Sequence, residues 1–585
     1  MDYINLVESY EKIEKTTKRL EIIEILVELF KNTPNDVIDK VVYLTMGKLY
    51  PDYVGIEIGI ADKLAIKSIS LTTGINEEEI KSSLNRIGDL GLVAEEMVAK
   101  KKQKSLFFTP LTVERVYTTF KNIGAAIGGG AQELKMKLIS EILHDSKPKE
   151  AKYIIRAIIG KLRLGVGDMT IIDALAKTFA KKEERDEIEN TYNRYPDLGA
   201  IAVALKKGGI EKLKEFKLKI GVPVRAMLAE RLTSIEEIFE KTGGECAFEY
   251  KYDGLRIQAH IGKEITLFSR RLENVTSQFP DIVNELREVF KGHEAIVEGE
   301  AVPVNLHTGE ILPFQEISHR RGRKYDVDSA IEEYPVVLFL FDCLLLDGEE
   351  MIWKDYLKRR SALNEAMRPT SKISISDATI TSDKTKAEEF FQKSIESGCE
   401  GLIAKSISAE SFYRAGARGW QWIKFKRDYK AEMHESADLV IVGAFAGKGR
   451  RAGTYGALLM AAYNKEKDRF ETVCKLGTGF KDELLSQLPK KLSKYIIPKI
   501  YPNVESKLKP DFWLIPEVVI EVSGAEITLS PVHTCCLGKI KKGYGLAIRF
   551  PRFTGIWRSD KGATDATTSE EFENFYRRQL KKIEV

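Results

Sequence analysis

The sequence predicts a multidomain protein in which an all-α segment is followed by an α+β segment and then by a small β-barrel. Apolar residues repeat at helical spacing in the first third, the repeat changes to two from Gly243, and short strands with glycine turns fill the chain from about residue 431. With 585 residues the chain is too long for one core. Its length corresponds to about three to five domains, and we expect domains over residues 1–215, 216–430 and 431–585.

Composition and charge limit the kind of protein. Hydrophobic residues make up 43% and charged residues 30% of the chain, as in soluble globular proteins. A net charge of +4 is too small to predict nucleic-acid binding, which must come from local basic patches. The six cysteines show neither zinc spacing nor a disulfide framework, so we expect buried thiols in a reducing compartment. We find no signal sequence, and the longest apolar stretch, Val336–Leu346, is too short to span a bilayer, so we expect an intracellular protein without a membrane segment.

The first 215 residues are typical of packed helices, with apolar residues at helical spacing as in Leu20–Phe30. Glycines stand at several helix junctions, and Gly165–Asp168 follows the cations Arg156, Lys161 and Arg163. Backbone N–H groups at helix starts can bind phosphates. Glycine is also common wherever a helix ends, so the sequence leaves both interpretations open.

A basic run precedes a short aromatic segment in Lys100–Phe108. Gln103, Leu106, Phe107 and Phe108 resemble the peptide with which replication proteins bind the sliding clamp. Such a peptide forms a short helical turn that inserts apolar side chains into a pocket. The alternative is an aromatic cluster buried under a helix.

The middle segment is organised around residues 249–254, Glu-Tyr-Lys-Tyr-Asp-Gly. Strand alternation places Glu249, Lys251 and Asp253 on one face. A lysine becomes a nucleophile when burial or neighbouring positive charge disfavours its ammonium form, and Gly254 would let a ligand approach the backbone. We expect the following cations to act on Lys251: Arg256, Lys405, Lys424 and Lys426. Read alone, the stretch is more typical of a charged surface strand.

Around this lysine the period of two predicts strands over Phe248–His260 and Glu264–Ser269, paired as a hairpin across Gly262-Lys263. A helix is expected from about Pro280 to Phe290, and an acidic strand over Ala295–Val302. These elements bring further charged positions into the same segment.

The middle segment also supplies acidic positions, Glu300 and Glu400, further cations and one aromatic residue, Phe341. Phosphoryl and nucleotidyl transfer need such a set, because cations neutralise phosphates, a carboxylate-bound Mg²⁺ offsets developing charge and an aromatic ring stacks on a base. Each of these residues alone is compatible with an exposed strand face.

The order of these motifs resembles that of the ATP-dependent DNA ligases, which belong to the covalent nucleotidyltransferase superfamily. In chain order the motifs are Lys-x-Asp-Gly at 251–254, Ser-Arg-Arg at 269–271, Glu-Gly-Glu at 298–300, Phe-Asp at 341–342, Glu-Gly-Leu-Ile-Ala-Lys at 400–405, Trp-Ile-Lys-Phe-Lys at 422–426, and Arg-Phe-Pro-Arg-Phe at 549–553 with Asp-Lys at 560–561. The helical first third, with Arg163–Asp168, resembles the DNA-binding domain of the archaeal and eukaryotic replicative type. The resemblance covers nearly the whole chain.

The resemblance implies that the three segments are a helical DNA-binding domain, an adenylation (nucleotidyltransferase) domain and an OB-fold domain. It implies an enzyme that seals nicks in double-stranded DNA during replication, repair and recombination. Lys251 would form a lysyl-AMP with ATP, the AMP would pass to the 5′-phosphate of the nick, and the 3′-hydroxyl would displace it. The resemblance further implies Mg²⁺ or Mn²⁺ as cofactor, nicked DNA as partner, a monomer, and a possible contact with the sliding clamp.

The resemblance also implies roles for the remaining residues. Glu249 would accept a hydrogen bond from the adenine amino group, and Phe341 would stack on the base. Glu300 would contact the ribose or a metal-bound water, and Glu400 would help to hold the metal. The nucleotide and the phosphates would be held by Arg256, Arg270, Arg418, Lys424 and Lys426. The barrel would orient the pyrophosphate with Arg552, Arg558, Asp560 and Lys561.

Two positions depart from the family pattern. Ile556 stands where archaeal relatives usually carry a basic residue, and Ala226 stands where a proline is common. An RNA ligase or an mRNA-capping guanylyltransferase shares the Lys-x-Asp-Gly core, but these enzymes rarely carry so large a helical domain. A catalytically inactive scaffold that binds the clamp and DNA has no need of Lys251 or Glu400.

Overall fold

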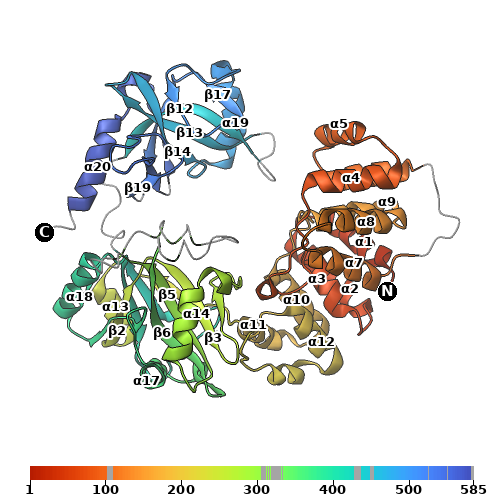
Figure 1. Cartoon of the computed structure of the whole chain (residues 1–585), viewed down its shortest axis with the longest axis horizontal. Helices are drawn as coiled ribbons and strands as arrows, with labels where there is room; N and C mark the ends of the chain where they lie inside the picture. The colour runs from red at the N-terminus through yellow and green to blue at the C-terminus, as the bar shows by residue number, and fades with distance from the viewer. Residues whose placement is uncertain are drawn as a thin grey trace. The chain divides into compact units, whose positions relative to one another are not determined.

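The structure, a computed structural model, describes residues 1–101, 110–304, 311, 314, 317, 320, 331, 334–426, 436–447, 454–524, 526–549 and 551–581. The chain divides into two compact units (Figure 1). One comprises Met1–Leu232, Glu236–Ala387 and Ile403–Lys424, and the other Thr233–Ile235, Glu388–Leu402 and Phe425–Val585. The expected domain boundaries near residues 215 and 430 stay a prediction.

The first third is helical, as predicted. Its helices are α1 (Tyr3–Glu14), α2 (Arg19–Asn32), α3 (Ile38–Thr45), α4 (Asp62–Thr73), α5 (Glu77–Ile87), α6 (Leu90–Ala99), α7 (Val113–Ala125), α8 (Ala131–His144), α9 (Pro148–Ile158), α10 (Asp168–Phe179), α11 (Arg185–Arg194) and α12 (Leu198–Gly208). Their apolar faces share one core, in which Phe30, Phe120 and Tyr153 are fully buried.

Helix α9 is buried from Glu150 to its end at Ile158, and this includes the charged residues Lys152 and Arg156. Lys152 Nζ lies 2.6 Å from carboxylate oxygens of both Glu11 and Glu14, and Arg156 Nη2 lies 3.0 Å from Asp89. Buried charges persist when they are paired. These ion pairs therefore fix α1 and the residue before α6 against α9.

Two sheets form the middle of the chain. One has the strand order β1 (Leu228–Arg231), β11 (Arg418–Lys426), β10 (Gly401–Ser406), β2 (Cys246–Lys251), β9 (Ala378–Thr381). The other has the order β4 (Thr266–Ser269), β3 (Leu255–Ile261), β5 (Ala295–Pro303), β6 (Val336–Leu346), β7 (Glu349–Glu350), with β8 (Ile373–Ile375) beside β6. The helices of this part are α13 (Ile235–Thr242), α14 (Pro280–Val289), α17 (Tyr356–Ala366) and α18 (Lys384–Glu396).

The expected strand over Phe248–His260 is wrong in one respect, because it is two strands in different sheets. Strand β2 ends at Lys251, and β3 begins at Leu255 and forms the predicted hairpin with β4. Gly254 lies in the turn between them, where a Cβ atom would collide with the carbonyl oxygen of Ala301 on β5. The chain thus changes sheet directly after the lysine, and only a residue without a side chain fits there.

The second unit is built on long antiparallel strands, β12 (Ala437–Ala446), β13 (Tyr455–Asn464) and β14 (Arg469–Leu476). The sheet is extended by β15 (Ile496–Ile497), β16 (Val504–Glu505), β17 (Phe512–Leu514), β18 (Val519–Ser523) and β21 (Arg552–Trp557). A separate pair is β19 (Glu526–Ser530) with β20 (Gly545–Arg549), and the helices are α19 (Asp482–Leu492) and α20 (Ser569–Lys581).

Strand β12 is buried on both faces. Leu439 and Ile441 pack in one apolar cluster of the second unit, and Val440 and Val442 pack in another. Irregular register between Ile441 and Gly443 bends the strand, so that it pairs with β17 at one end and β18 at the other. This accounts for the apolar run that the sequence shows at this point.

All six cysteines are free and buried, as predicted. No helix in the described part of the chain is both long enough and apolar enough to cross a membrane.

Candidate active site

Lys251 is the last residue of β2 and is half-buried. The neighbouring Gly254 turn packs against β5, and a Cβ atom on Gly254 would lie 3.0 Å from Cγ of Glu300. On its Cβ side, Gly254 is therefore in close contact with the protein's own strand, and the expected approach of a ligand to its backbone stays a prediction. The same packing places Glu300 beside the turn that follows the candidate nucleophile.

Glu249 is buried, two residues before Lys251 on the same strand. Its carboxylate accepts hydrogen bonds from the Tyr356 hydroxyl, from Arg360 Nη1 at 3.1 Å and from the Ser376 hydroxyl at 3.2 Å. Lys405 Nζ lies 2.9 Å from Oε2, the oxygen that also accepts from Ser376. A carboxylate offers about four lone-pair sites, so the chain itself occupies the hydrogen-bonding capacity of Glu249.

Lys405 connects the two sheets. It lies on β10, pairs with Glu249 on β2, and donates a hydrogen bond of 3.1 Å to the carbonyl oxygen of Phe341 on β6. Its ammonium group lies 5.0 Å from the ring centroid of Phe341 and 4.5 Å from that of Trp422. Burial lowers the pKa of Lys405, although the carboxylates of Glu249 and Asp342 oppose the shift. The sequence predicts a cation here that acts on Lys251, and the structure shows that this cation is buried and paired with Glu249.

Arg256 is half-buried on β3 beside the aromatic rings of Phe341 and Trp422. Its Nη2 lies 2.6 Å from Glu298, its Nη1 donates to the carbonyl oxygen of Met227 at 3.2 Å, and the guanidinium lies 5.3 Å from the ring centroid of Phe341. Burial alone would lower the pKa of Arg256, but Glu298 outweighs it and raises the pKa. Its Nε has no hydrogen-bond partner among the residues that the structure describes, so one buried donor remains for a ligand.

Phe341 is half-buried on β6 between these cations. Its ring meets that of Trp422 edge-on, with centroids 6.0 Å apart. Asp342, the next residue, forms a buried ion pair with Arg359 of α17, with Nε 2.7 Å from Oδ1. The Phe-Asp motif therefore combines a half-buried ring with a structural carboxylate.

The other predicted site residues of this part lie on or beside the two sheets. Glu300 is half-buried on β5, opposite Arg256 on β3. Arg270 is exposed directly after β4, and Arg418 is exposed at the start of β11. Lys424 is half-buried further along β11.

Glu400 precedes β10 and forms an ion pair with Lys426, with the two charged atoms 2.5 Å apart. Thus a predicted metal ligand and a predicted phosphate ligand neutralise each other. Among the described residues there is no cluster of three or more His, Cys, Asp or Glu side chains of the kind that holds a metal ion.

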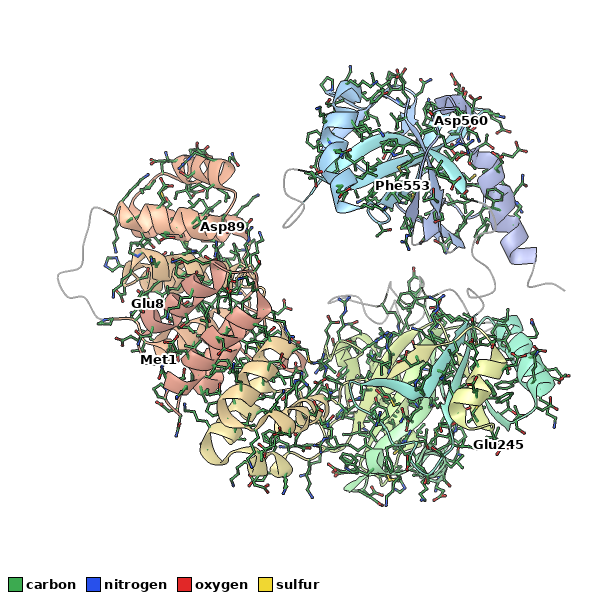
Figure 2. All side chains as sticks on the ribbon, turned by 180° about the vertical axis from the view of Figure 1, so that it is seen from behind. Met1, Glu8, Asp89, Glu245, Phe553 and Asp560 are labelled. Atoms are coloured by element: carbon green, nitrogen blue, oxygen red, sulfur yellow. The ribbon has the colours of Figure 1, made fainter. Side chains whose placement is uncertain are left out.

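The charged tail of the second unit forms one network around Asp438, the second residue of β12. Arg558 Nη1 lies 2.8 Å and Lys561 Nζ 2.6 Å from Asp438 Oδ2, and Arg558 Nη2 lies 2.7 Å from Asp560. Figure 2 labels Asp560 in this unit, where its side chain is exposed. Arg552 is exposed at the start of β21, on a hollow that Lys481 and Phe553 also line.

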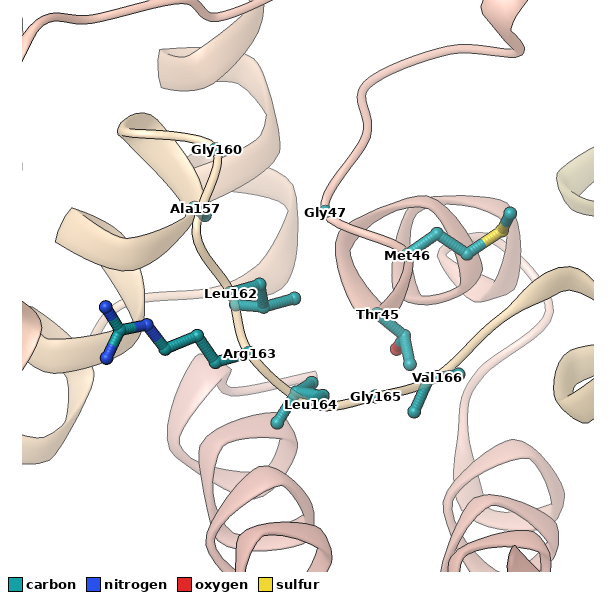
Figure 3. A pocket seen from close by; sticks show the side chains of 10 residues that line it. All are labelled: Thr45, Met46, Gly47, Ala157, Gly160, Leu162, Arg163, Leu164, Gly165 and Val166. Carbon is teal, nitrogen blue, oxygen red and sulfur yellow. The ribbon is translucent and has the colours of Figure 1, made fainter. Parts of the chain in front are cut away.

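A hollow of about 210 Å³ lies between the end of α3 and the loop that follows α9 (Figure 3). Loop residues 162–166 line one side, and Gly47 lies on the other. Arg163, with φ 61°, and Gly165, with φ 67°, are both left-handed. Left-handed residues in a loop turn backbone N–H groups together, as in phosphate-binding nests. The Arg163 guanidinium donates to Asp89 at 2.8 Å.

The clamp-like segment with Gln103, Leu106, Phe107 and Phe108 lies outside the described residues. The interpretation of that segment stays a prediction.

Sequence reasoning missed the partners of the predicted residues. Glu298 is buried and also accepts hydrogen bonds from Tyr413 at 2.8 Å and from Gln258 at 3.2 Å. Glu298 and Glu300 lie on the same face of β5. The Glu-Gly-Glu motif is therefore the feature of the sequence that could have indicated Glu298. No signal pointed to Tyr356, Arg360, Ser376 or Asp438, because their contacts depend on long-range packing.

Comparison with known proteins gives matches along the whole chain. The family model "ATP dependent DNA ligase domain" matches residues 226–426, "DNA ligase N terminus" matches 2–176, and "ATP dependent DNA ligase C terminal region" matches 451–561. A protein named "DNA ligase 2" from Thermofilum pendens is 51% identical over 591 residues, which cover 99% of this chain and 98% of that protein. A "DNA ligase" from Staphylothermus marinus is 48% identical and covers 100% of both chains.

A solved structure described as "Pmar-Lig_Pre." has a TM-score of 0.54 with 18% identity and covers 95% of this chain and 99% of that chain. At this identity the match shows a common fold. The fold therefore comprises an N-terminal helical domain, a central adenylation domain and a C-terminal domain. The chain is an enzyme that belongs to the ATP-dependent DNA ligase family.

Proposed function

We propose that the chain seals nicks in double-stranded DNA, with ATP as the energy source and Lys251 as the nucleophile. One observation supports this most. In a chain of this family, Lys251 ends β2 directly before the turn where the chain changes sheet, and that turn packs beside Glu300. The nucleophile thus lies at the junction of the two sheets that carry the other proposed site residues. RNA sealing and GTP use are the alternatives to test.

The reaction has three steps in this proposal. The neutral amine of Lys251 attacks the α-phosphorus of ATP, the bond to the bridging oxygen breaks, pyrophosphate leaves, and the amine loses a proton. The 5′-phosphate of the nick then attacks the lysyl-AMP phosphorus and releases the lysine. Finally the 3′-hydroxyl attacks the activated 5′-phosphate, loses its proton and displaces AMP.

The residues around Phe341 would hold the nucleotide. Phe341 would stack on the base, and the buried Nε of Arg256 would donate to the nucleotide, since it is otherwise without a partner in the described chain. Glu249 could accept a hydrogen bond from the adenine amino group only if that group displaces one of the four donors that now bind the Glu249 carboxylate. Base recognition by Glu249 therefore requires local rearrangement.

The remaining cations would neutralise phosphate charge along the reaction path. We assign this role to Arg270, Arg418, Lys424 and Lys426. Mg²⁺ or Mn²⁺ would add charge neutralisation when bound, and Glu300 and Glu400 fit it, because Mg²⁺ takes one or two carboxylates together with substrate phosphates. Glu400 would then exchange its present partner, Lys426, for the metal.

We assign the last segment to an OB-fold that acts in the first step and then in DNA binding. Its antiparallel strands and its bent β12 suit such a barrel. Arg552, Arg558, Asp560 and Lys561 would orient the pyrophosphate. Arg558 and Lys561 can do so only after part of their interaction with Asp438 is given up.

The helical domain would bind the duplex, with the hollow at loop 162–166 receiving a backbone phosphate. We further propose a monomer that acts inside the cell on replicating and repaired DNA and contacts the sliding clamp through residues 103–108.

The test is a labelling and chase experiment. The chain is incubated with α-labelled ATP or GTP and Mg²⁺, and then chased with nicked DNA or nicked RNA. Covalent label should appear with ATP, transfer to nicked DNA, and disappear in Lys251→Ala. Lys263→Ala is the matched control, because it replaces an exposed lysine in the turn between β3 and β4. This variant should be labelled as strongly as the unmodified chain. Label that persists in Lys251→Ala would refute the assignment of the nucleophile, and transfer to RNA alone would refute the substrate.

A further inference from the structure

Residues 216–227 form the connector between the helical part and the two sheets, and an ion pair joins this connector to the helical part. Asp168 is the first residue of α10 and follows the loop that lines the hollow in Figure 3. Its Oδ2 accepts a hydrogen bond from the Tyr192 hydroxyl at 2.7 Å and lies 3.0 Å from Nη1 of Arg225 in the connector. The Arg225 guanidinium also lies 4.9 Å from the ring centroid of Tyr192.

The backbone of Arg225 is bound on both sides. Its N–H donates to the carbonyl oxygen of Asn193 at 2.8 Å, and its carbonyl oxygen accepts from the N–H of Gly416 at 3.0 Å. Gly416 has φ +67°, and a Cβ atom there would collide with the Asn193 side chain. The helical part, the connector and the loop before β11 are therefore in direct contact at Arg225.

The connector residues around Arg225 contact the groups that hold Arg256. Val224 exchanges two hydrogen bonds with the side chain of Gln258, at 2.7 and 3.0 Å. The N–H of Met227 donates to the Tyr413 hydroxyl at 2.8 Å, and its carbonyl oxygen accepts from Arg256. Gln258, Tyr413 and Arg256 all bind the carboxylate of Glu298. A continuous series of polar contacts thus runs from Asp168 to Arg256.

We propose that Arg225 is a positioning residue for the DNA-dependent steps, a role that rests on the proposed nick-sealing function. Through Asp168 it sets the orientation of loop 162–166, and with it the bound duplex, relative to the nucleotide site. The first step needs no DNA and does not depend on this orientation. Transfer of AMP to the nick and strand closure require the nick to meet Lys251, and a displacement of about 1 Å costs on the order of 100-fold in rate.

The geometry favours positioning over stabilisation. The side chains of Arg225 and Asp168 are 32% and 30% exposed, and ion pairs with such access to solvent add little to the free energy of folding. The guanidinium also binds two groups of the helical part, Asp168 and Tyr192. Loss of the side chain should therefore leave the fold intact and loosen the helical part relative to the sheets.

The experiment compares Arg225→Gln and Asp168→Asn, singly and together, with Arg287→Gln, which removes an exposed charge from α14. Self-adenylation is measured with labelled ATP, and sealing is measured in single turnovers on a pre-adenylated nick. We expect self-adenylation within twofold of the unmodified chain, and sealing slowed roughly 10- to 100-fold in both single variants. The double variant should be no worse than the poorer single variant, because both remove one interaction.

Salt dependence separates positioning from direct DNA binding. A cation that contacts a DNA phosphate contributes about one unit to the slope of log affinity against log salt concentration. Arg225→Gln should leave this slope unchanged while the sealing rate falls. A slope lowered by about one unit, equal loss in both half-reactions, or normal sealing in both single variants would each overturn the proposal. If the unmodified chain itself fails to label or to seal, the proposed function fails instead.

Discussion

The ion pair between Lys405 and Glu249 gives a quantitative test of how the nucleotide site is built. Their side chains are only 2% and 3% exposed. Replacing Lys405 by methionine keeps most of the side-chain volume beneath Phe341 and Trp422 but leaves Glu249 with one fewer cation. Breaking a buried pair in this way costs roughly 3–5 kcal/mol, and we expect about 3 kcal/mol here because Arg360 still binds the carboxylate.

Thermal unfolding of the chain measures this loss. For a domain of about 200 residues, a loss of about 3 kcal/mol lowers the unfolding temperature by roughly 6–12 °C. Lys384→Met is the matched control, because Lys384 pairs with Glu236 at the surface, where the side chains are 53% and 57% exposed. That pair should contribute about 0–1 kcal/mol. If the two variants lose the same stability, then the pair with Glu249 behaves as a surface pair, and our account of the site is refuted.

Two further predictions concern the same sheets. Burial lowers the pKa of His260 to about 3, whereas an unfolded histidine titrates near about 6.5. As the pH falls, the unfolded chain therefore takes up a proton at this histidine before the folded chain does. The free energy of unfolding should fall by up to about 1.4 kcal/mol per pH unit from about pH 6.5 towards 3. His260→Asn should remove this part of the pH dependence, which urea unfolding measures. Gly254→Ala should cost roughly 1–3 kcal/mol and slow self-adenylation, because its Cβ would strike the Ala301 carbonyl oxygen. Gly129→Ala, with nothing within 4 Å, should do neither.

Local patterns predicted the elements that local interactions determine. Helix α14 and strand β5 lie within a residue of their expected bounds, and the hairpin of β3 with β4 forms across Gly262-Lys263. The period of two could not show that β2 and β3 belong to different sheets. An unbroken alternation looks the same whether or not the chain changes sheet, and only the packing of Gly254 on Ala301 distinguishes the two.

The ion pairs between neighbouring strands could not be predicted from the sequence, for a related reason. Arg256 lies opposite Glu300 in the β3–β5 register, yet its ion pair is the diagonal one with Glu298. Opposite and diagonal neighbours on one sheet face are both within reach of a long side chain. Gln258, which lies opposite Glu298 on β3, and Tyr413 also bind Glu298, and Tyr413 comes from a distant part of the chain.

Four of the cations that the sequence predicts for phosphate binding form ion pairs with carboxylates of the same chain. Lys426 pairs with Glu400, Arg558 and Lys561 pair with Asp438, and Arg256 pairs with Glu298. A buried cation is costly when it is unpaired, and the ion pair with Glu298 avoids this cost for Arg256, the least exposed of the four side chains. A phosphate that binds one of these four cations at its paired nitrogen has to replace a carboxylate there, and the affinity gained at that cation is the difference between the two interactions. If the proposed roles are right, we expect binding of a phosphate at these cations to accompany release of a carboxylate, and occupancy of the site would then be coupled to movement of the elements that carry those carboxylates.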